Sequence, residues 1–409
     1  MRSAFPTRIP FSEACAILDR VASASPMPTQ AQPLTRCLGH VLAADLIADF
    51  SVPAFDNSAM DGFAARGSDL QADGDILLTV IGEQFAGTSR DLAIESGQCV
   101  RITTGAPMPA GADTVVIKEN VTLHGDQLTV PGPVRIGAHR RSAGEDVRTG
   151  DRVLAAGQVL TPAALSLAAA VGQHELGVYR RPTVAIFTTG DELKPPGSPL
   201  AAGEIFDSNR VLLQTLLAAD GFEPVAWPVL PDDPDRILAA LRDAASSFDV
   251  VLTCGGVSAG EKDYLPKLLA EHGSVHFWKV MMRPGMPFLA GHLGSAQLLC
   301  LPGNPVSVFA TYLTLARRLL DGIQGRAEPR PRLYARLSAP IAKTHARLEF
   351  LRGALHCDEA GQMRVTMNPA DGSHRLRAVA ESNALIVVPE GAGQWPAGAV
   401  LEVLPLSGA

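Results

Sequence analysis

Three short apolar runs in the middle of the chain end in glycine-rich polar loops, and this repeated pattern constrains the fold most strongly. Residues 184–192 read Val-Ala-Ile-Phe-Thr-Thr-Gly-Asp-Glu, and the same change recurs over 249–256 and 296–305. Short apolar runs bounded by turn residues are typical of buried parallel strands. The sequence therefore predicts one sheet that contains all three strands.

Helical patterns separate these predicted strands. They cover residues 210–219, 234–245, 264–271 and 305–320. Alternation of strands and helices indicates an α/β domain, in which ligands bind beyond the carboxyl ends of the strands at a switch in strand order. We therefore expect the loops at 188–192, 255–263 and 302–305 to face one crevice.

The regions on either side follow other patterns, and a chain of 409 residues is too long for one domain. Residues 11–21 and 34–46 read as amphipathic helices, and Thr161-Pro162 begins another helix that Gly172 ends. Residues 76–134 predict a small β-rich domain. After residue 325 no helical pattern remains, and short strands predict a β-barrel or sandwich.

Charge and cysteine content exclude several classes of protein. A net charge of −7 gives no general affinity for nucleic acid. Six cysteines form no Cys-x-x-Cys pair, so neither a zinc site nor a disulfide framework is predicted, and a reducing cytoplasm is expected. No segment approaches a membrane span, and no Gly-x-Gly-x-x-Gly or P-loop motif follows a first strand.

The loops after the predicted strands combine features that suit an anion with acidic side chains. Glycines and a helix start at Asn304-Pro305 would offer backbone N–H groups to an anion. The carboxylates in or near these loops are Asp191, Glu192, Asp232, Asp233, Glu261 and Asp263. Bare carboxylates repel phosphate, and a Mg²⁺ ion bridging both resolves the conflict. Each acid taken singly fits a helix cap or a turn equally well.

Lys279 and Arg283 are candidates for binding phosphate or another oxyanion, although solvated surface side chains are the more common role of such residues. Trp278 is expected in the core. His374 is expected in a turn, since no nearby nucleophile supports a catalytic triad.

Six motifs occur in the order found in molybdopterin molybdenumtransferases. They span residues 56–62, 103–107, 144–146, 189–193, 255–258 with Asp263-Tyr264, and 302–305. From about residue 10 to its end the chain resembles a bacterial member of that family, and it is similar to the C-terminal domain of gephyrin. Six motifs in series are far more specific than any one of them.

The resemblance implies a multidomain fold of α/β plus β class and an elongated homodimer. It implies a discontinuous helical linker domain (1–46 and 144–180), an inserted β-rich domain (47–143), a molybdopterin-binding three-layer α/β domain (181–326) and a C-terminal β-barrel domain (327–409).

The resemblance also implies a transferase of molybdenum cofactor biosynthesis. Such enzymes insert molybdate at the dithiolene sulfurs of adenylated molybdopterin and release AMP, with Mg²⁺ assisting cleavage of the phosphoanhydride. The implied partners are these two substrates, a second copy of the chain, and, transiently, the molybdopterin adenylyltransferase and the enzymes that accept the cofactor. Molybdate and tungstate share shape and charge, so both stay open as substrates.

Positions that match the family's functional residues supply the candidate site. The candidate catalytic residues are Asp61, Thr104, Asp146, Glu192 and Asp263, of which Glu192, Asp263 and Asp61 are candidate Mg²⁺ ligands. Asp61, Thr104 and Asp146 would come from the β-rich domain of the partner chain. The candidate substrate-binding residues are Asp232, Lys279, Arg283, Pro302, Pro305, Arg352 and Ser373. Where family members often carry lysines, this chain has Arg283 and Met286, and the methionine removes a positive charge.

Two alternative functions stay open beside the leading one. The chain could transfer an adenylyl group onto molybdopterin, since adenylyltransferases share a similar α/β domain. It could also be a scaffold that binds molybdopterin without turnover, as the similarity to gephyrin permits.

Overall fold

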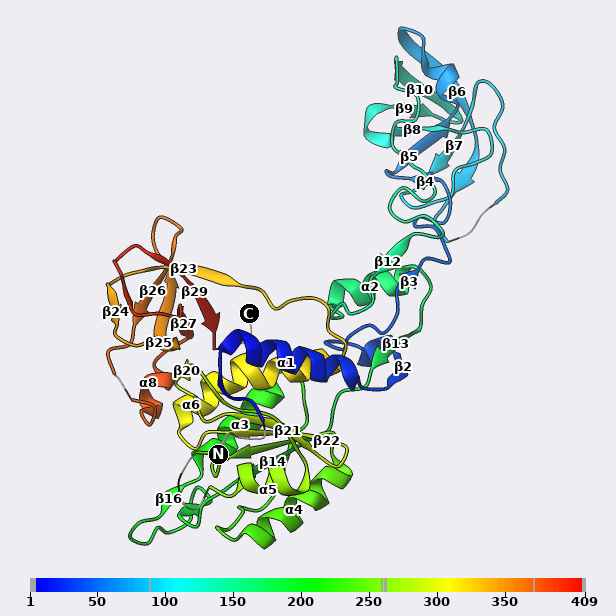
Figure 1. Cartoon of the computed structure of the whole chain (residues 1–409). Coiled ribbons are helices and arrows are strands. Elements are labelled where there is room, and N and C mark those ends of the chain that lie inside the picture. The colour runs from blue at the N-terminus through cyan, green and yellow to red at the C-terminus, as the bar shows by residue number, and fades with distance from the viewer. Residues whose placement is uncertain (1–4, 88–89, 259, 261–262, 371, 407–409) are drawn as a thin grey trace. The chain divides into compact units, whose positions relative to one another are not determined.

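The computed structural model describes residues 5–87, 90–258, 260, 263–370 and 372–406 (Figure 1). The chain divides into two compact units. Unit 1 comprises Met1–Gln30, Gly39–Ala43 and Val178–Ala409, and unit 2 comprises Ala31–Leu38 and Ala44–Gly177. The four domain boundaries expected from the sequence stay predictions. Within the described ranges, no helix has the length and apolar character that a membrane crossing would need.

A seven-stranded sheet forms the centre of unit 1 (Figure 1). Its strand order is β1 (Thr7–Ile9), β19 (Ser274–Val280), β21 (Leu289–Leu293), β22 (Ala296–Leu301), β18 (Val250–Cys254), β14 (Val184–Thr188) and β17 (Val225–Ala226). All neighbours pair in parallel except β21, which is antiparallel to both of its neighbours. Because β14, β18 and β22 are adjacent, the prediction of one sheet with three strand exits is confirmed.

Two hydrophobic cores cover the two faces of this sheet. The larger core joins the sheet to α1 (Phe11–Ala24), α3 (Ser208–Ala219), α6 (Pro305–Thr311), a π-helical turn (Tyr312–Ala316) and α7 (Arg317–Ile323). The smaller one joins it to α4 (Pro234–Ser247) and α5 (Leu265–His272). These helices confirm the predicted ones, except that the helix expected over 305–320 is interrupted by the π-helical turn.

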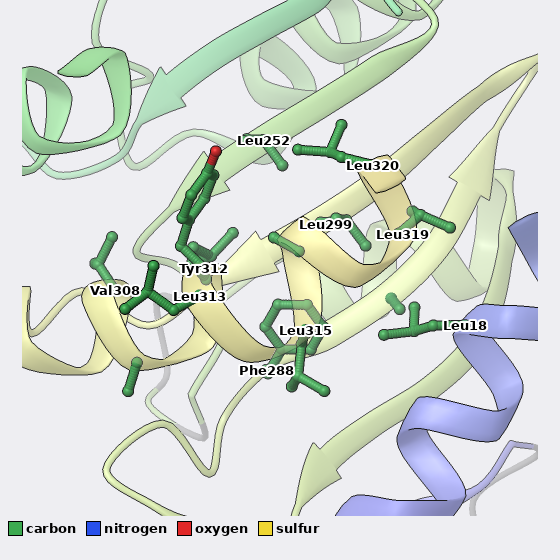
Figure 2. Packing of buried hydrophobic residues seen from close by; sticks show 14 of the residues in the cluster. Leu18, Leu252, Phe288, Leu299, Val308, Tyr312, Leu313, Leu315, Leu319 and Leu320 are labelled. Atoms are coloured by element: carbon green, nitrogen blue, oxygen red, sulfur yellow. The ribbon is translucent and has the colours of Figure 1, made fainter. Parts of the chain in front are cut away.

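The larger core places a hydroxyl among apolar side chains. Figure 2 shows Tyr312 near Leu252, Leu299 and Leu320, and its side chain is fully buried. A buried tyrosine hydroxyl needs a hydrogen-bond partner. Tyr312 donates to Asp220 over 2.7 Å, and Asp220 lies directly after the C-terminal end of α3.

The last part of unit 1 is a closed β-barrel, as the sequence predicts. The strands β25 (Leu348–Cys357), β26 (Met363–Met367), β23 (Leu333–Leu337), β29 (Val400–Pro405) and β27 (Ala384–Val388) follow one another, and β27 pairs with β25 to close the ring. A short strand β20 (Met282–Arg283) extends it beside β25, and β24 (Ile341–Lys343) pairs with β28 (Gly393–Trp395).

The expectation of no helix after residue 325 is wrong. The helix α8 spans Leu376–Ala380. Its five residues are too few to show a helical period of apolar positions.

Unit 2 contains the predicted β-rich region. Its six-stranded sheet has the order β8 (Thr114–Ile117), β5 (Gly62–Ala65), β7 (Gln98–Ile102), β6 (Gly74–Gln84), β10 (Gln127–Gly132) and β9 (Thr122–His124). Short pairs join β4 (Asn57–Ser58) to β11 (Arg140–Arg141), and β3 (Leu46–Ile47) to β12 (Arg152–Leu154). The predicted helix α2 (Pro162–Ala170) starts where the Thr161 hydroxyl accepts a hydrogen bond from the Ala164 backbone over 3.2 Å.

The helix expected over 34–46 is wrong. The strand β2 (Thr29–Pro33), which pairs with β13 (Glu175–Tyr179), leads into a single 3-10 turn over Leu34–Arg36. Gly39 then has a φ of 72°, which no α-helix interior accepts. The apolar spacing that resembled a helix instead buries Val41 and Leu42 beside an isolated bridge from Leu42 to Val178.

Candidate active site

A cleft of about 960 Å³ in unit 1 lies at the carboxyl ends of β14, β18 and β22. The strand β14 has β17 on one side and β18 on the other, so the strand order reverses there. A reversal of strand order opens a crevice at the strand ends. The loops after all three strands line this cleft, which confirms that they face one crevice.

Most of the candidate residues from unit 1 line the cleft. They are Glu192, Asp232, Asp263, Arg283, Pro302, Pro305, Arg352 and Ser373. Met286 and His374 line it as well. Glu261, counted above among the nearby acids, lies outside the described residues.

Lys279 is the one candidate of unit 1 that does not line this cleft. Its backbone has a φ of 67°, and its ammonium nitrogen lies 4.0 Å from the centre of the Trp278 ring. A cation over an aromatic face is an attractive contact in its own right. The Trp278 ring nitrogen donates to the Val257 carbonyl over 2.9 Å, and the half-buried ring packs against the smaller core, so the expected core position is met only in part.

Glu192 is positioned by the turn that follows β14. Gly190 has a φ of 137°, and a Cβ at that position would lie 2.6 Å from Oε1 of Glu192. Since real Cβ atoms do not approach that closely, the missing side chain of Gly190 makes room for the carboxylate. The Glu192 carbonyl accepts from the Ile205 backbone over 2.8 Å, which fixes the residue from the other side.

The acids near the other strand ends have different roles. Asp263 Oδ2 accepts a hydrogen bond from the Gly260 backbone over 2.7 Å, so its own loop orients this carboxylate. Asp233 accepts from the backbones of Asp235 and Arg236 and caps α4, whereas Asp232 lines the cleft. The cap is therefore Asp233, and Asp232 stays a candidate substrate-binding residue.

The carboxylate oxygens of the cleft fit a hard cation that also binds water and substrate oxygens. Among the described residues, no three His, Cys, Asp or Glu side chains come together as a metal site. Mg²⁺ does not need such a group, because it binds through one or two carboxylates, water and substrate phosphate. The carboxylate of Glu192, for which Gly190 leaves room, and that of Asp263, which the Gly260 backbone orients, line the same cleft and supply donors of that kind.

The cationic side of the cleft comes from the strand β20 and the barrel. Arg283 Nε lies 3.4 Å from a carboxylate oxygen of Glu349, and His345 Nε2 lies 3.3 Å from the same oxygen. The guanidinium of Arg352 is buried and donates to the carbonyls of Gly372 and Ala370. Arg352 therefore holds the loop that carries Ser373, which accepts from the Asn304 side chain over 2.9 Å.

Asp207 and Asn209 are among the cleft residues that were missed from the sequence. Asp207 is 2% exposed, accepts from the Thr188 hydroxyl over 2.6 Å and from Arg210 Nε over 3.0 Å, and caps α3. Asn209 donates to the Gly303 carbonyl over 2.6 Å. The aspartate before the helical pattern at 210–219 was a usable capping signal, but no local pattern predicts the reach of Asn209 to Gly303.

Two of the three candidates of unit 2 contact each other. Asp61 Oδ1 accepts from the Thr104 backbone over 2.9 Å and from its hydroxyl over 3.0 Å, and Lys118 Nζ lies 3.3 Å from Oδ2. The Thr104 hydrogen bonds, followed by Lys118, lower the pKa of Asp61 below its usual value. Asp146 is exposed, and its backbone donates to the Val52 carbonyl over 3.1 Å. The structure thus brings Asp61 and Thr104 together.

Comparison with known proteins assigns these parts. The description "MoeA N-terminal region (domain I and II)" matches residues 9–172, "Probable molybdopterin binding domain" matches 185–322, and "MoeA C-terminal region (domain IV)" matches 334–406. The strand exits of the cleft therefore lie in a probable molybdopterin-binding domain, and the side of the cleft that carries Arg352 and Ser373 lies in the MoeA C-terminal region.

Relatives of the whole chain agree. The molybdopterin molybdenumtransferase of Haemophilus influenzae is 38% identical over 93% of this chain and 95% of its own length. The molybdopterin molybdenumtransferase 2 of Mycobacterium tuberculosis is 37% identical over 92% and 94%. The crystal structure of the molybdopterin biosynthesis moeA protein of Pyrococcus horikoshii has a TM-score of 0.82 at 30% identity, over 97% of this chain and 99% of that one.

These findings define a multidomain transferase that acts in molybdenum cofactor biosynthesis. The chain belongs to the molybdopterin molybdenumtransferase family.

Proposed function

We propose that the protein inserts molybdate into adenylated molybdopterin and releases AMP in a Mg²⁺-dependent reaction. The observation that carries this proposal is the composition of the cleft in unit 1. The carboxylates of Glu192 and Asp263 line it together with glycine-rich strand exits, on a domain whose family description is probable molybdopterin binding. An adenylated pterin carries a phosphoanhydride, and such a group needs both hard-cation and N–H contacts.

In this proposal Glu192 and Asp263 hold Mg²⁺, and Asp61 is a further candidate ligand. The ion would neutralise the negative charge that develops on the phosphoanhydride. Asp232 positions the substrate beside them. Pro302 and Pro305 keep the third strand exit rigid, since proline fixes its own φ.

The basic residues have two different tasks. Arg283 lies on the open side of the cleft, with its side chain 40% exposed, and contributes positive charge toward phosphate and molybdate. Arg352 acts through the loop that it holds, which presents Ser373 to the substrate. Lys279 stays a candidate for the pterin or phosphate side, on family resemblance alone.

The residues of unit 2 enter the proposal through the family resemblance. Asp61, Thr104 and Asp146 would act in a homodimer, as the second group of side chains that the reaction needs. Mixing inactive Glu192→Gln protein with inactive Asp61→Asn protein tests this directly. Restored activity in the mixture is expected if the two groups come from different chains, and no restoration would reject the shared site.

The function is tested by the release of AMP. Purified protein, adenylated molybdopterin, Mg²⁺ and molybdate should yield AMP, whereas omission of Mg²⁺ or molybdate should prevent its release. AMP that stays bound at every molybdate concentration would overturn the proposal. Consumption of ATP with unmodified molybdopterin would indicate an adenylyltransferase, and binding without turnover would indicate a scaffold.

A further inference from the structure

Two large apolar side chains on the wall of the cleft are strongly exposed. Ile205 is 54% exposed and Phe206 is 44% exposed, and both line it. Phe350 also lines the cleft but is only 3% exposed, because its ring packs in the larger core. An aromatic ring that stays open to a binding cleft offers apolar area to a ligand.

The backbone fixes the position of Phe206. The strands β15 (Leu193–Lys194) and β16 (Ile205–Phe206) pair in parallel, with Leu193 opposite Ile205 and Lys194 opposite Phe206. The Asp207 backbone donates to the Lys194 carbonyl over 2.8 Å, and the side chains of Lys194 and Glu204 form an ion pair of 3.1 Å. The ring is therefore attached to an ordered strand pair.

The same strand pair connects the ring to the acidic end of the cleft. The backbone of Ile205 donates to Glu192, and the residue after Phe206 is the buried cap Asp207. A ligand that contacts Phe206 with a flat ring and Glu192 through a metal-bound phosphate would use both ends of one rigid element. A nucleotide and a phosphorylated pterin each combine a flat ring with a phosphate group.

We propose that Phe206 is the stacking platform for a planar heterocycle of the substrate, with Ile205 extending the apolar surface. The inference rests on the proposed function and adds to it the residue that recognises the ring. The ring is either the adenine or the pterin of adenylated molybdopterin, since both present the same kind of flat aromatic face.

Binding of separate ligand halves tests the proposal. Isothermal titration calorimetry would measure the affinity of AMP, of molybdopterin and of ribose 5-phosphate for wild type and for Phe206→Ala. Stacking of a base on an aromatic side chain predicts a loss of roughly tenfold to a hundredfold for the ligand whose ring contacts Phe206. Ribose 5-phosphate has no aromatic ring, so its affinity should not change.

Matched variants separate stacking from general effects. Phe206→Tyr retains a flat ring and should bind within about twofold of wild type, because stacking tolerates this change. Leu200→Ala removes an exposed apolar side chain, 43% exposed, that does not line the cleft, and it should leave all affinities unchanged. The oligomeric state of each variant would be measured in the same samples by light scattering.

Each outcome has a defined meaning. Loss for AMP alone assigns the adenine to Phe206, and loss for molybdopterin alone assigns the pterin. Equal affinity of wild type and Phe206→Ala for both ligands overturns the inference while the proposed function stands, and so does a change in oligomeric state without a change in affinity. If the wild type binds neither ligand, both the function and the inference are rejected.

Discussion

The acids of unit 1 lie in two kinds of surroundings. The side chain of Asp220 is 6% exposed and receives the Tyr312 hydroxyl at 2.7 Å, Arg317 Nε at 2.8 Å and Arg330 at 3.5 Å. Glu192 and Asp263 line the cleft, and within the described part of the chain neither carboxylate forms an ion pair with a basic side chain.

The difference separates acids that stabilise the fold from acids that are available to a ligand. A buried carboxylate is tolerated only with partners, so the arginines around Asp220 satisfy a structural requirement. A carboxylate at an open cleft keeps its capacity for a metal ion when no basic side chain pairs with it. Asp61 in unit 2 is intermediate, since it is exposed and also contacts Lys118.

The largest expected effect comes from neutralising the cleft acids. Glu192→Gln and Asp263→Asn should each lower the rate of AMP release by about 100-fold to 1,000-fold, as the loss of one strong electrostatic contact at a reacting group does. Since both acids lack basic partners among the described residues, unfolding free energies should change by less than about 0.5 kcal/mol. AMP release and urea unfolding measure the two quantities.

Asp233→Asn is the matched control for this change. Asp233 also follows a strand but caps α4, and asparagine caps a helix about as well as aspartate. Its activity and stability should stay close to those of wild type. Equal losses of activity in Asp233→Asn and Glu192→Gln would show that the acids of this region share one general role. The distinction between capping acids and cleft acids would then be rejected.

Asp220→Asn should show the opposite pattern. It leaves Arg317 and Arg330 without their buried anion, and breaking such a pair costs about 3–5 kcal/mol of unfolding free energy. The activity of the folded fraction should be retained. Denaturant unfolding, with AMP release measured at a temperature where the variant is folded, checks both statements.

Asp19→Asn removes the partner of an exposed arginine and serves as the control. Asp19 and Arg318 form an ion pair of 2.6 Å, but their side chains are 51% and 46% exposed. Exposed pairs contribute about 0–1 kcal/mol, so this variant should lose far less stability than Asp220→Asn. Similar losses in the two variants would mean that burial does not distinguish the two acids.

The sequence predicts the strand exits of the cleft because the signals are local. The apolar run over 184–188 and the glycine after it specify a buried strand and its turn without reference to the rest of the chain. The same holds for Thr161 and Pro162, which start α2 where predicted. Patterns of this kind depend on neighbours within one turn or one strand.

The contacts that assemble the cleft depend on distant residues and have no local signal. Asn209 reaches Gly303 across 94 positions, and Asn304 reaches Ser373 across 69. Likewise, the apolar spacing of 34–46 fits a helix by itself, but Gly39 takes a left-handed conformation that ends any helix there. Asp233 directly precedes Pro234 and so carries the same capping signal as Thr161, but no local pattern predicts that Asp232 lines the cleft.

A smaller loss of activity is expected from Gly190→Ala. The new Cβ would meet the Glu192 carboxylate, so the carboxylate must move. The alanine would also have to adopt a φ of 137°, which strains its backbone. A displacement of about 1 Å at a catalytic group costs up to roughly 100-fold, and we expect a loss of about 10-fold in AMP release.

Gly203→Ala controls for the backbone in this test. Gly203 has a φ of 90° but has no atom within 4 Å of its Cβ position, so this variant carries backbone strain without the contact. It should lose some stability and little activity. If both glycine variants lose activity equally, the position of the Glu192 carboxylate is not what Gly190 protects.

The smallest effect concerns the acid of unit 2. Thr104→Val removes the hydroxyl that donates to Asp61 and keeps the backbone donor, so the pKa of Asp61 should rise toward its usual value. Because the folded-state pKa is lowered, the stabilisation is present above the unfolded-state pKa and is lost as pH falls through the folded value. In Thr104→Val that loss should be smaller and should be complete at a higher pH. Carbon-13 NMR titration of the Asp61 carboxyl measures this change in pKa, and Asp61→Asn assigns the signal. Thr103→Val is the control. The Thr103 hydroxyl accepts from the Ala86 backbone and not from Asp61, so the pKa of Asp61 should stay unchanged in this variant. Identical titration midpoints of Asp61 in wild type and Thr104→Val would show that Lys118 and the backbone alone hold Asp61 ionised. Asp61 would then resemble the paired acid Asp220 more than the cleft acids Glu192 and Asp263.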